Sequence, residues 1–299
     1  MKFIVTGGAG FIGNNIVRNL VKKGHSVEIV DNMHTGKMKN LIGIKKDIKL
    51  HKIDIRDFQE LEKILRNADG VFHEAALTAV QESYKKTKEY FDVNVKGTKN
   101  IFEIGKKHNF KVVYASSSSI YGNTVKVPIK ENFSRNPINP YGETKLQDEF
   151  LAEKYSKFID IIGLRYFNVY GKGQTNTYAG VITKFMNRLN SKKQPKIFGD
   201  GSQKRDFIFV EDVAEANVRI MLSKVKTGFF NIGTGKAISI NHLAKVMLSL
   251  YGLEMTPMLL KPLEGDVKNS QANIDLLTKK INWKPKTQLK KGLGTLIRK

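Results

Sequence analysis

Residues 2–13 read KFIVTGGAGFIG and place a short apolar run, three spaced glycines and the start of an amphipathic pattern in direct succession. The run predicts a buried strand over Lys2–Thr6, and the pattern predicts a helix over Phe11–Lys23. Glycines at positions 7, 10 and 13 permit a tight turn, a close approach of the backbone to a pyrophosphate, and close packing of helix on strand. The N–H groups at the helix start would favour a phosphate. Glycine is also common in ordinary turns, so the loop alone leaves a purely structural interpretation open.

Short apolar runs continue to alternate with helical patterns, which predicts an α/β fold of the Rossmann type, with a doubly wound parallel sheet. Further strands are expected over Ser26–Asp31, Lys49–Asp54, Gly70–Glu74, Lys111–Ser116 and Asp160–Val169. Further helices are expected over Asp57–Asn67, Glu82–Lys107 (in more than one piece) and Pro140–Ser156. The pattern loosens after residue 170. We therefore expect a first domain over residues 1–170 and a smaller α/β substrate lobe over residues 171–299, with the chain crossing between them more than once.

Composition excludes several classes of protein. The 299 residues include 51 Lys plus Arg and 28 Asp plus Glu, a formal net charge of +23. The basic residues are scattered and not interleaved with aromatic ones, which predicts a lysine-rich surface that favours anionic small ligands, and no nucleic-acid partner. There is no cysteine, and the six histidines show no metal-ligand spacing, so no metal is expected. No long apolar run or leader precedes the first strand, which predicts a cytoplasmic protein without a membrane partner.

Carboxylates close the second and third expected strands. Asp31 follows the last of the three glycines at the distance at which a dinucleotide-binding unit binds the adenosine ribose hydroxyls. A carboxylate there repels a 2′-phosphate and favours NAD over NADP, whereas the neighbouring Lys37 and Lys39 favour the opposite. Asp54 and Ile55, at the next strand end, could hold the adenine edge.

Two side chains suited to acid–base chemistry share one helical face. Tyr141 and Lys145 are four residues apart, and Pro140 suits a helix N-terminus. A phenol is a poor base at neutral pH, but a neighbouring ammonium and a cationic nicotinamide stabilise the phenolate. Such a pair also occurs on ordinary surface helices. Ser116–Ser119 end another expected strand, where one hydroxyl could share a substrate proton or the serines could simply form a polar turn.

Together these motifs resemble the extended short-chain dehydrogenase/reductase family, specifically its nucleotide-sugar 4-epimerases of the UDP-glucose 4-epimerase type. The similarity covers nearly the whole chain. It rests on Thr6–Gly13, Asp31-Asn32, Asp54-Ile55, His73–Ala76, Asn94–Thr98, Ser116–Gly122, Asn139–Lys145, Leu164–Gly171, Gly199–Gly201, Arg205–Phe207, Asn231–Gly235 and Trp283–Pro285.

The resemblance implies a resident NAD in the first domain, with Tyr141 as acid and base, Lys145 tuning it and Ser117 as the shared hydroxyl. Tyr141 would take the proton of the sugar 4-hydroxyl while the hydride passes to NAD, and the hydride would return to the opposite face of the 4-keto sugar. Asn94 could equally be a helix cap. Implied cofactor contacts are Gly7, Gly10, Phe11, Ile12, Gly13, Asp31, Asn32, Thr35, Gly36, Asp54, Ile55, Ala75, Ala76, Leu77, Asn94, Ser116, Tyr141, Lys145 and Tyr166.

The resemblance also implies a UDP-sugar in the second lobe. Leu263 stands where the family usually has an arginine, so one phosphate contact is missing. Ser270 falls at the position where a large aromatic side chain would clash with an acetamido group. It therefore predicts that UDP-GlcNAc and UDP-GalNAc are accepted alongside UDP-Glc and UDP-Gal, unless it is only a small packing residue. Implied substrate contacts are Ser117, Asn168, Gly180, Val181, Phe198, Arg205, Asp266 and Ser270.

The same region of the sequence also bears on other activities. Ser118 and Ser119 stand where 4,6-dehydratases carry an Asp-Glu pair, which disfavours dehydration. A UDP-glucuronate 4-epimerase and a net NAD(P)H-dependent sugar-nucleotide oxidoreductase remain open. The intact set of Ser117, Tyr141 and Lys145 argues against a non-catalytic NAD-binding or basic interaction protein. The family further implies a homodimer formed through helices around Thr98–Lys107 and Tyr141–Ser156.

Overall fold

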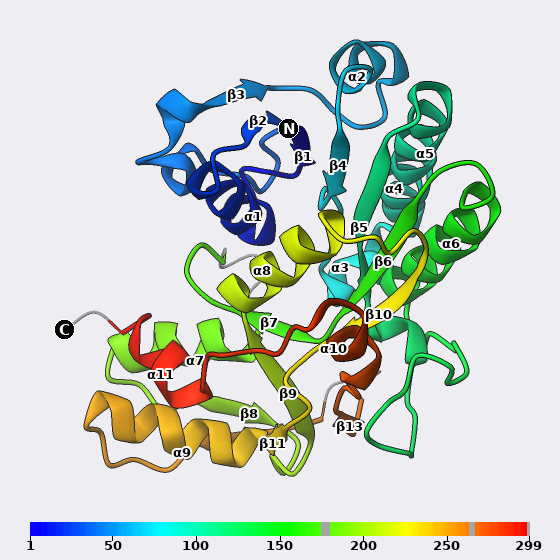
Figure 1. Ribbon diagram of the computed structural model, residues 1–299. Helices are drawn as coiled ribbons and strands as arrows, with labels where there is room; N and C mark the ends of the chain where they lie inside the picture. Colours follow the sequence, from blue (N-terminus) through cyan, green and yellow to red (C-terminus); the bar gives the residue numbers. More distant parts are fainter. Residues whose placement is uncertain (175–179, 263–266, 298–299) are drawn as a thin grey trace.

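The computed structural model describes residues 1–174, 180–262 and 267–297. Its main layer is a seven-stranded sheet in the order β10-β6-β5-β4-β1-β2-β3, in which every neighbouring pair is parallel (Figure 1). This confirms the expected Rossmann-type sheet. The strands are β1 (Lys2–Thr6), β2 (Ser26–Val30), β3 (Ile48–His51), β4 (Gly70–His73), β5 (Lys111–Ser117), β6 (Ile161–Tyr166) and β10 (Gly228–Ile232).

Helices cover both faces of this sheet and create two separate cores (Figure 1). The side chains of Phe3 and Val5 on β1 join one core, and that of Ile4 joins the other, because successive side chains of a strand point to opposite faces. A strand buried on both faces therefore reads as a continuous apolar run. The covering helices are α1 (Phe11–Lys22) and α8 (Val210–Met221) on one face, and α2 (Phe58–Leu65), α5 (Gly97–His108) and α6 (Pro140–Tyr155) on the other.

Three expected elements differ in their limits. The helical stretch after residue 80 breaks into α3 (Val80–Lys85), α4 (Thr87–Tyr90), a π-helical turn (Phe91–Lys96) and α5. The strand expected over Asp160–Val169 is two strands, because the chain leaves the main sheet at Phe167 and continues as β7 (Asn168–Tyr170) in another. The third strand ends at His51, so Asp54 lies in the turn that follows.

A smaller α/β lobe lies beside the carboxyl edge of the main sheet (Figure 1). Its central strand, β9, pairs with β7 and β13 in parallel and with β11 in antiparallel orientation. Its own core includes Phe185, Leu243 and Met247. The remaining elements are α7 (Val181–Asn190), β8 (Lys196–Phe198), β9 (Lys204–Phe209), β11 (Ala237–Ser239), α9 (Ile240–Tyr251), β12 (Met258–Leu260), β13 (Asn269–Ser270), α10 (Asp275–Ile281) and α11 (Leu289–Gly294).

The chain returns to the main sheet after entering the lobe. Helix α8 packs against α1, and β10 extends the sheet beside β6. Val213 and Phe230 belong to the same core as Val5. The division at residue 170 stays a prediction. No helix within the described ranges is long and apolar enough to cross a membrane.

Candidate active site

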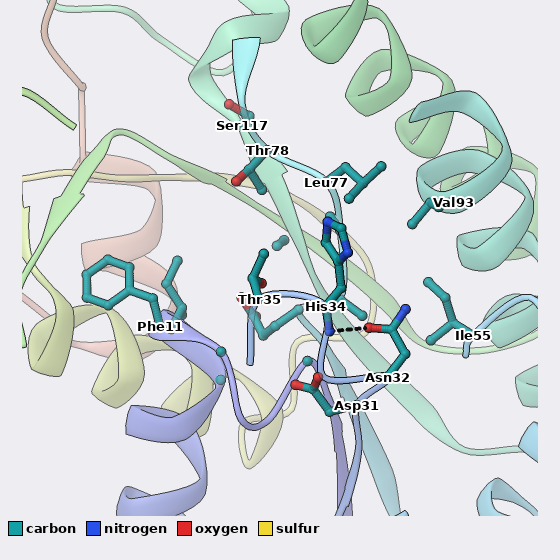
Figure 2. A pocket seen from close by; sticks show the side chains of 18 of the residues that line it. Phe11, Asp31, Asn32, His34, Thr35, Ile55, Leu77, Thr78, Val93 and Ser117 are labelled. Carbon is teal, nitrogen blue, oxygen red and sulfur yellow. Dashed lines mark hydrogen bonds between the residues drawn. The ribbon is translucent and has the colours of Figure 1, made fainter. Parts of the chain in front are cut away.

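A cavity of about 330 Å³ opens at the carboxyl edge of the main sheet. It lies where the strand order reverses between β1 and β4, the usual ligand position in such sheets. Figure 2 shows Asp31 and Ser117 at opposite ends of it, with Ile55, Leu77 and Val93 along one wall. Residues that follow five of the parallel strands, namely β1, β2, β3, β4 and β6, line this one cavity.

The glycine loop after β1 has no room for a side chain at Gly7 or Gly13. A Cβ atom on Gly13 would lie 2.2 Å from the carbonyl oxygen of Gly7, and one on Gly7 would lie 2.8 Å from the backbone nitrogen of Ala75. Gly7 also has a φ of +66°, which favours glycine. Backbone therefore lines this side of the cavity.

Asp31 is held rigidly at the far end of the cavity. One carboxylate oxygen accepts the N–H of Ala9 at 3.0 Å, and the other accepts the N–H of Met33 at 2.8 Å. Burial raises the pKa of Asp31, and these two N–H groups oppose that rise. A Cβ atom on Gly36 would lie 2.7 Å from the carboxylate, so Gly36 leaves Asp31 its space although it does not line the cavity.

Asp54 organises the same end through Arg56. The guanidinium donates from Nε and Nη2 to the two oxygens of Asp54, each at 2.9 Å, and from Nη1 to Asp92 at 2.8 Å. Asn32 donates to Asp54 at 2.9 Å. The Arg56 hydrogen bonds hold the pKa of Asp54 well below its usual range, against the effect of burial. Arg56 lines the cavity but was not among the expected contacts, because an arginine after a strand end has no distinctive pattern.

At the other end, Ser117, Tyr141 and Lys145 line one cavity. Ser117 Oγ accepts the N–H of Ser119 at 3.1 Å, which leaves its own hydrogen for donation. Asn139 caps α6 by accepting the N–H of Gly142 at 2.8 Å, and Pro140 fills the first turn, so the helix begins where Tyr141 faces the cavity.

Glu74 is a cavity-lining carboxyl that belongs to the His73–Ala76 motif but was not among the expected contacts. Tyr166 Oη donates to it at 2.8 Å, and Asn217 donates to Tyr166 Oη at 2.8 Å. Burial raises the pKa of Glu74 to about 8, opposed by Tyr166 and Lys145. A charged residue directly after a buried strand could have signalled it.

Ser117 lines this cavity, but the other described residues expected to contact substrate lie in the lobe and do not line it. Ser270 pairs in register with Arg205 across β13 and β9. Asn168, on β7, donates from Nδ2 to the backbone oxygen of Asp206 at 3.2 Å. The others sit at the end of β8 (Phe198) and the start of α7 (Gly180, Val181). Asp266 and Leu263 lie outside the described residues. The cavity instead reaches the lobe side through Thr78, Phe167, Val169 and Gln174.

A model of the NAD dependent epimerase/dehydratase family matches residues 3–233. The chain belongs to this family. It is 38% identical, over 98% of its length and 96% of the relative, to a putative UDP-glucose 4-epimerase of Methanocaldococcus jannaschii. The match confirms the family that the motifs indicated: nucleotide-sugar 4-epimerases, which are NAD-dependent isomerases.

Two solved epimerase structures are similar throughout. One is the UDP-glucose 4-epimerase of Thermotoga maritima with UDP-glucose, at 33% identity and a TM-score of 0.94. The other is the UDP-N-acetylglucosamine 4-epimerase of Methanobrevibacter ruminantium in complex with UDP-N-acetylmuramic acid, at 35% identity and a TM-score of 0.94. Each comparison covers 98% of this chain and 96% of the other.

NAD is the cofactor of this family, and the cavity fits it. A side chain on Gly7 or Gly13 would fill the loop that a pyrophosphate must approach. The Asp31 carboxylate, held by two N–H groups, presents acceptors for ribose hydroxyls. Within the described ranges, no group of His, Asp and Glu could hold a metal ion.

Two residues that were expected to contact NAD form side-chain hydrogen bonds with neighbouring parts of the chain. Asn94 lies in the π-helical turn, where it neither lines the cavity nor caps a helix. Its side chain accepts the N–H of Leu77 at 2.8 Å and donates to the carbonyl of Leu77 at 3.0 Å. These two hydrogen bonds fix the loop after β4. Ser116 lines the cavity, but its hydroxyl donates to Glu149 on α6 at 2.7 Å. All other described residues expected to contact NAD, except Gly36, line the cavity.

His73, which ends β4 just before the cavity-lining Glu74, should make the stability of this epimerase pH-dependent. Thr6 Oγ1 and Thr98 Oγ1 lie 2.7 and 2.9 Å from its two ring nitrogens. Burial, helped by Lys145, lowers its pKa to about 3 from 6.5. The unfolded chain therefore binds the proton first as pH falls, so the stability from neutral His73 is complete above pH 6.5 and is lost between there and about pH 3.

We expect this loss to have a slope of about 1.4 kcal/mol per pH unit. Urea unfolding of the wild type and of His73→Gln at about pH 7 and about pH 5 measures it. The wild type should lose about 2 kcal/mol more than the variant between these pH values. Equal losses in the two proteins would contradict the prediction.

Proposed function

We propose that the protein interconverts the C4 epimers of UDP-hexoses, namely UDP-Glc with UDP-Gal and UDP-GlcNAc with UDP-GalNAc, using an NAD that stays bound. The observation that carries the proposal is the meeting of Ser117, Tyr141 and Lys145 in the cavity that also contains the glycine loop. Epimerisation needs one group that can accept and return a proton, and this cavity supplies it.

In this proposal Tyr141, as the phenolate, accepts the proton of the sugar 4-hydroxyl. Ser117 donates a hydrogen bond to the same oxygen, and the Lys145 ammonium stabilises the phenolate. When bound, NAD supplies the centre that takes up and returns the hydride of carbon 4. Tyr141 returns the proton to the 4-keto oxygen when the opposite face of the sugar is presented. Protons and hydride balance over the cycle, so no second substrate is consumed.

Ser270 supports acceptance of the N-acetylated sugars. It is a small buried side chain in register with Arg205, which we assign to the substrate diphosphate. A large aromatic side chain at this position would occupy the space that an acetamido group needs. The lysine-rich chain also makes UDP-glucuronate a substrate to be tested.

An NMR time course with UDP-Glc or UDP-GlcNAc and no added NAD tests the proposal. We expect the galacto epimer from both substrates. Ser270→Tyr should slow the UDP-GlcNAc reaction by about 10- to 100-fold and change the UDP-Glc reaction little. Equal slowing of both would contradict the role of Ser270. No epimer from either, with or without NAD, would overturn the proposed substrates, and UDP-glucuronate would then be tested before reductase activity.

The homodimer, the cytoplasmic location and the two-domain division belong to the same proposal. Exposed Phe150 on α6 lies on one of the two helices expected to form the dimer. Light scattering of the purified protein measures the oligomeric state.

A further inference from the structure

A buried carboxylate faces Lys145 from the next turn of α6. Asp148 Oδ2 lies 3.1 Å from Lys145 Nζ, and the two side chains are 0% and 3% exposed. Tyr141, Lys145 and Asp148 follow one another at spacings of four and three residues, so all three share one face of the helix. The ion pair is therefore shielded from water and adjoins the cavity that Lys145 lines.

Titratable groups on two elements surround this pair. Tyr141 on α6 and Glu74 after β4 act on Lys145, and the charge of Lys145 in turn helps keep His73, at the end of β4, neutral. The hydroxyl of Thr98, on α5, acts on Asp148. Glu149, next along α6, is committed to Arg165 at 2.8 Å. In the part of the chain that the structure describes, Asp148 is the only carboxylate in ion-pair contact with Lys145.

We propose that Asp148 is a positioning residue, which through this ion pair keeps the Lys145 ammonium charged and fixed beside Tyr141. The inference rests on the proposed function for its kinetic consequence only. A lysine side chain has a long flexible stem and three N–H donors. Holding one donor on Asp148 fixes the stem and leaves two donors for bound cofactor and substrate.

Electrostatics supports the geometry. Burial alone lowers the pKa of Lys145, but Asp148, Tyr141 and Glu74 more than offset that effect and raise it. Burial raises the pKa of Asp148 to about 6, opposed by Lys145 and Thr98. At neutral pH Asp148 therefore carries the charge that Lys145 needs. Removing it leaves a buried ammonium without its closest counter-charge, which favours the neutral amine.

Competitive acetylation of the holoenzyme, with the Lys145 peptide quantified by mass spectrometry across a pH series, measures this directly. In Asp148→Asn, which keeps the size of the side chain, the labelling midpoint of Lys145 should fall by about 1 pH unit or more. The matched control is Glu153→Gln on the same helix, where Glu153 is 46% exposed and pairs with Arg135. An unchanged midpoint in Asp148→Asn would overturn the proposal.

The pH profile of kcat gives a second readout. The alkaline limb should move to lower pH in Asp148→Asn by the same amount, whereas a merely structural role would lower kcat by one factor at every pH. If Asp148→Asn does not fold, Asp148→Ser tests the proposal: it also removes the counter-charge of Lys145, so the Lys145 midpoint should shift in the same direction, and no shift would contradict the proposal. Acetylation needs no turnover, so an inactive wild type would overturn only the proposed function.

Discussion

Tyr141→Phe should lower kcat for 4-epimerisation by about 1,000-fold, within the range that removal of a general acid–base group produces. Tyr141 lines the cavity beside Ser117 and Lys145, and phenylalanine keeps its ring but cannot accept the proton of the sugar 4-hydroxyl. The loss should appear in kcat, because the proton transfer occurs in the chemical step. The NMR assay measures it under saturating UDP-sugar.

The matched control is the retention of NAD and of thermal stability. We assign the phenolic oxygen of Tyr141 no role in folding. The backbone carbonyl of Tyr141 accepts the Thr144 hydroxyl at 2.7 Å, a bond that phenylalanine retains. Tyr141→Phe should therefore melt near the wild-type temperature and carry as much NAD. A variant that kept a tenth or more of the wild-type kcat would show that another group moves the proton.

Arg165→Met should lower the free energy of unfolding by about 3–5 kcal/mol, because it leaves a buried carboxylate without its partner. Arg165 and Glu149 are both buried, and the guanidinium donates to both oxygens of Glu149 at 2.8 Å. It also donates to Tyr121 Oη and to the carbonyl of Glu131, each at 2.7 Å. Urea unfolding at neutral pH measures the loss.

Arg135→Met is the matched control for this pair. Arg135 is 25% exposed and also reaches Glu149, at 3.1 Å, but its loss leaves the Arg165 pair intact. We expect a cost of no more than about 1 kcal/mol, because Arg135 is partly exposed to water. Equal losses in the two variants would show that Glu149 does not depend on Arg165. The pair matters for the site because Glu149 also accepts the hydroxyl of Ser116, next to Ser117.

Much of the candidate site could be predicted because its residues sit in local patterns. The glycine loop, Asp31 after the second strand and the Tyr141–Lys145 spacing each lie within one strand, turn or helix. The structure brings them to one cavity, since parallel strands end at a common edge. The limits of β3, the break between β6 and β7 and the π-helical turn could not be predicted, because neighbouring chain segments decide where a strand or helix ends.

By itself, the sequence determined the Rossmann-type sheet, the glycine loop and the family, because strand alternation, required glycines and helical spacing are local properties of the chain. Only the tertiary structure decided the partners of buried charges. Arg56 with Asp92, Glu74 with Tyr166, and Glu149 with Arg165 each join separate elements. Asp148 lies near Lys145 in sequence, yet its significance depends on its burial, which only the packing of α6 against other elements, α5 among them, provides. A charge in a sequence has no dielectric environment until the fold surrounds it.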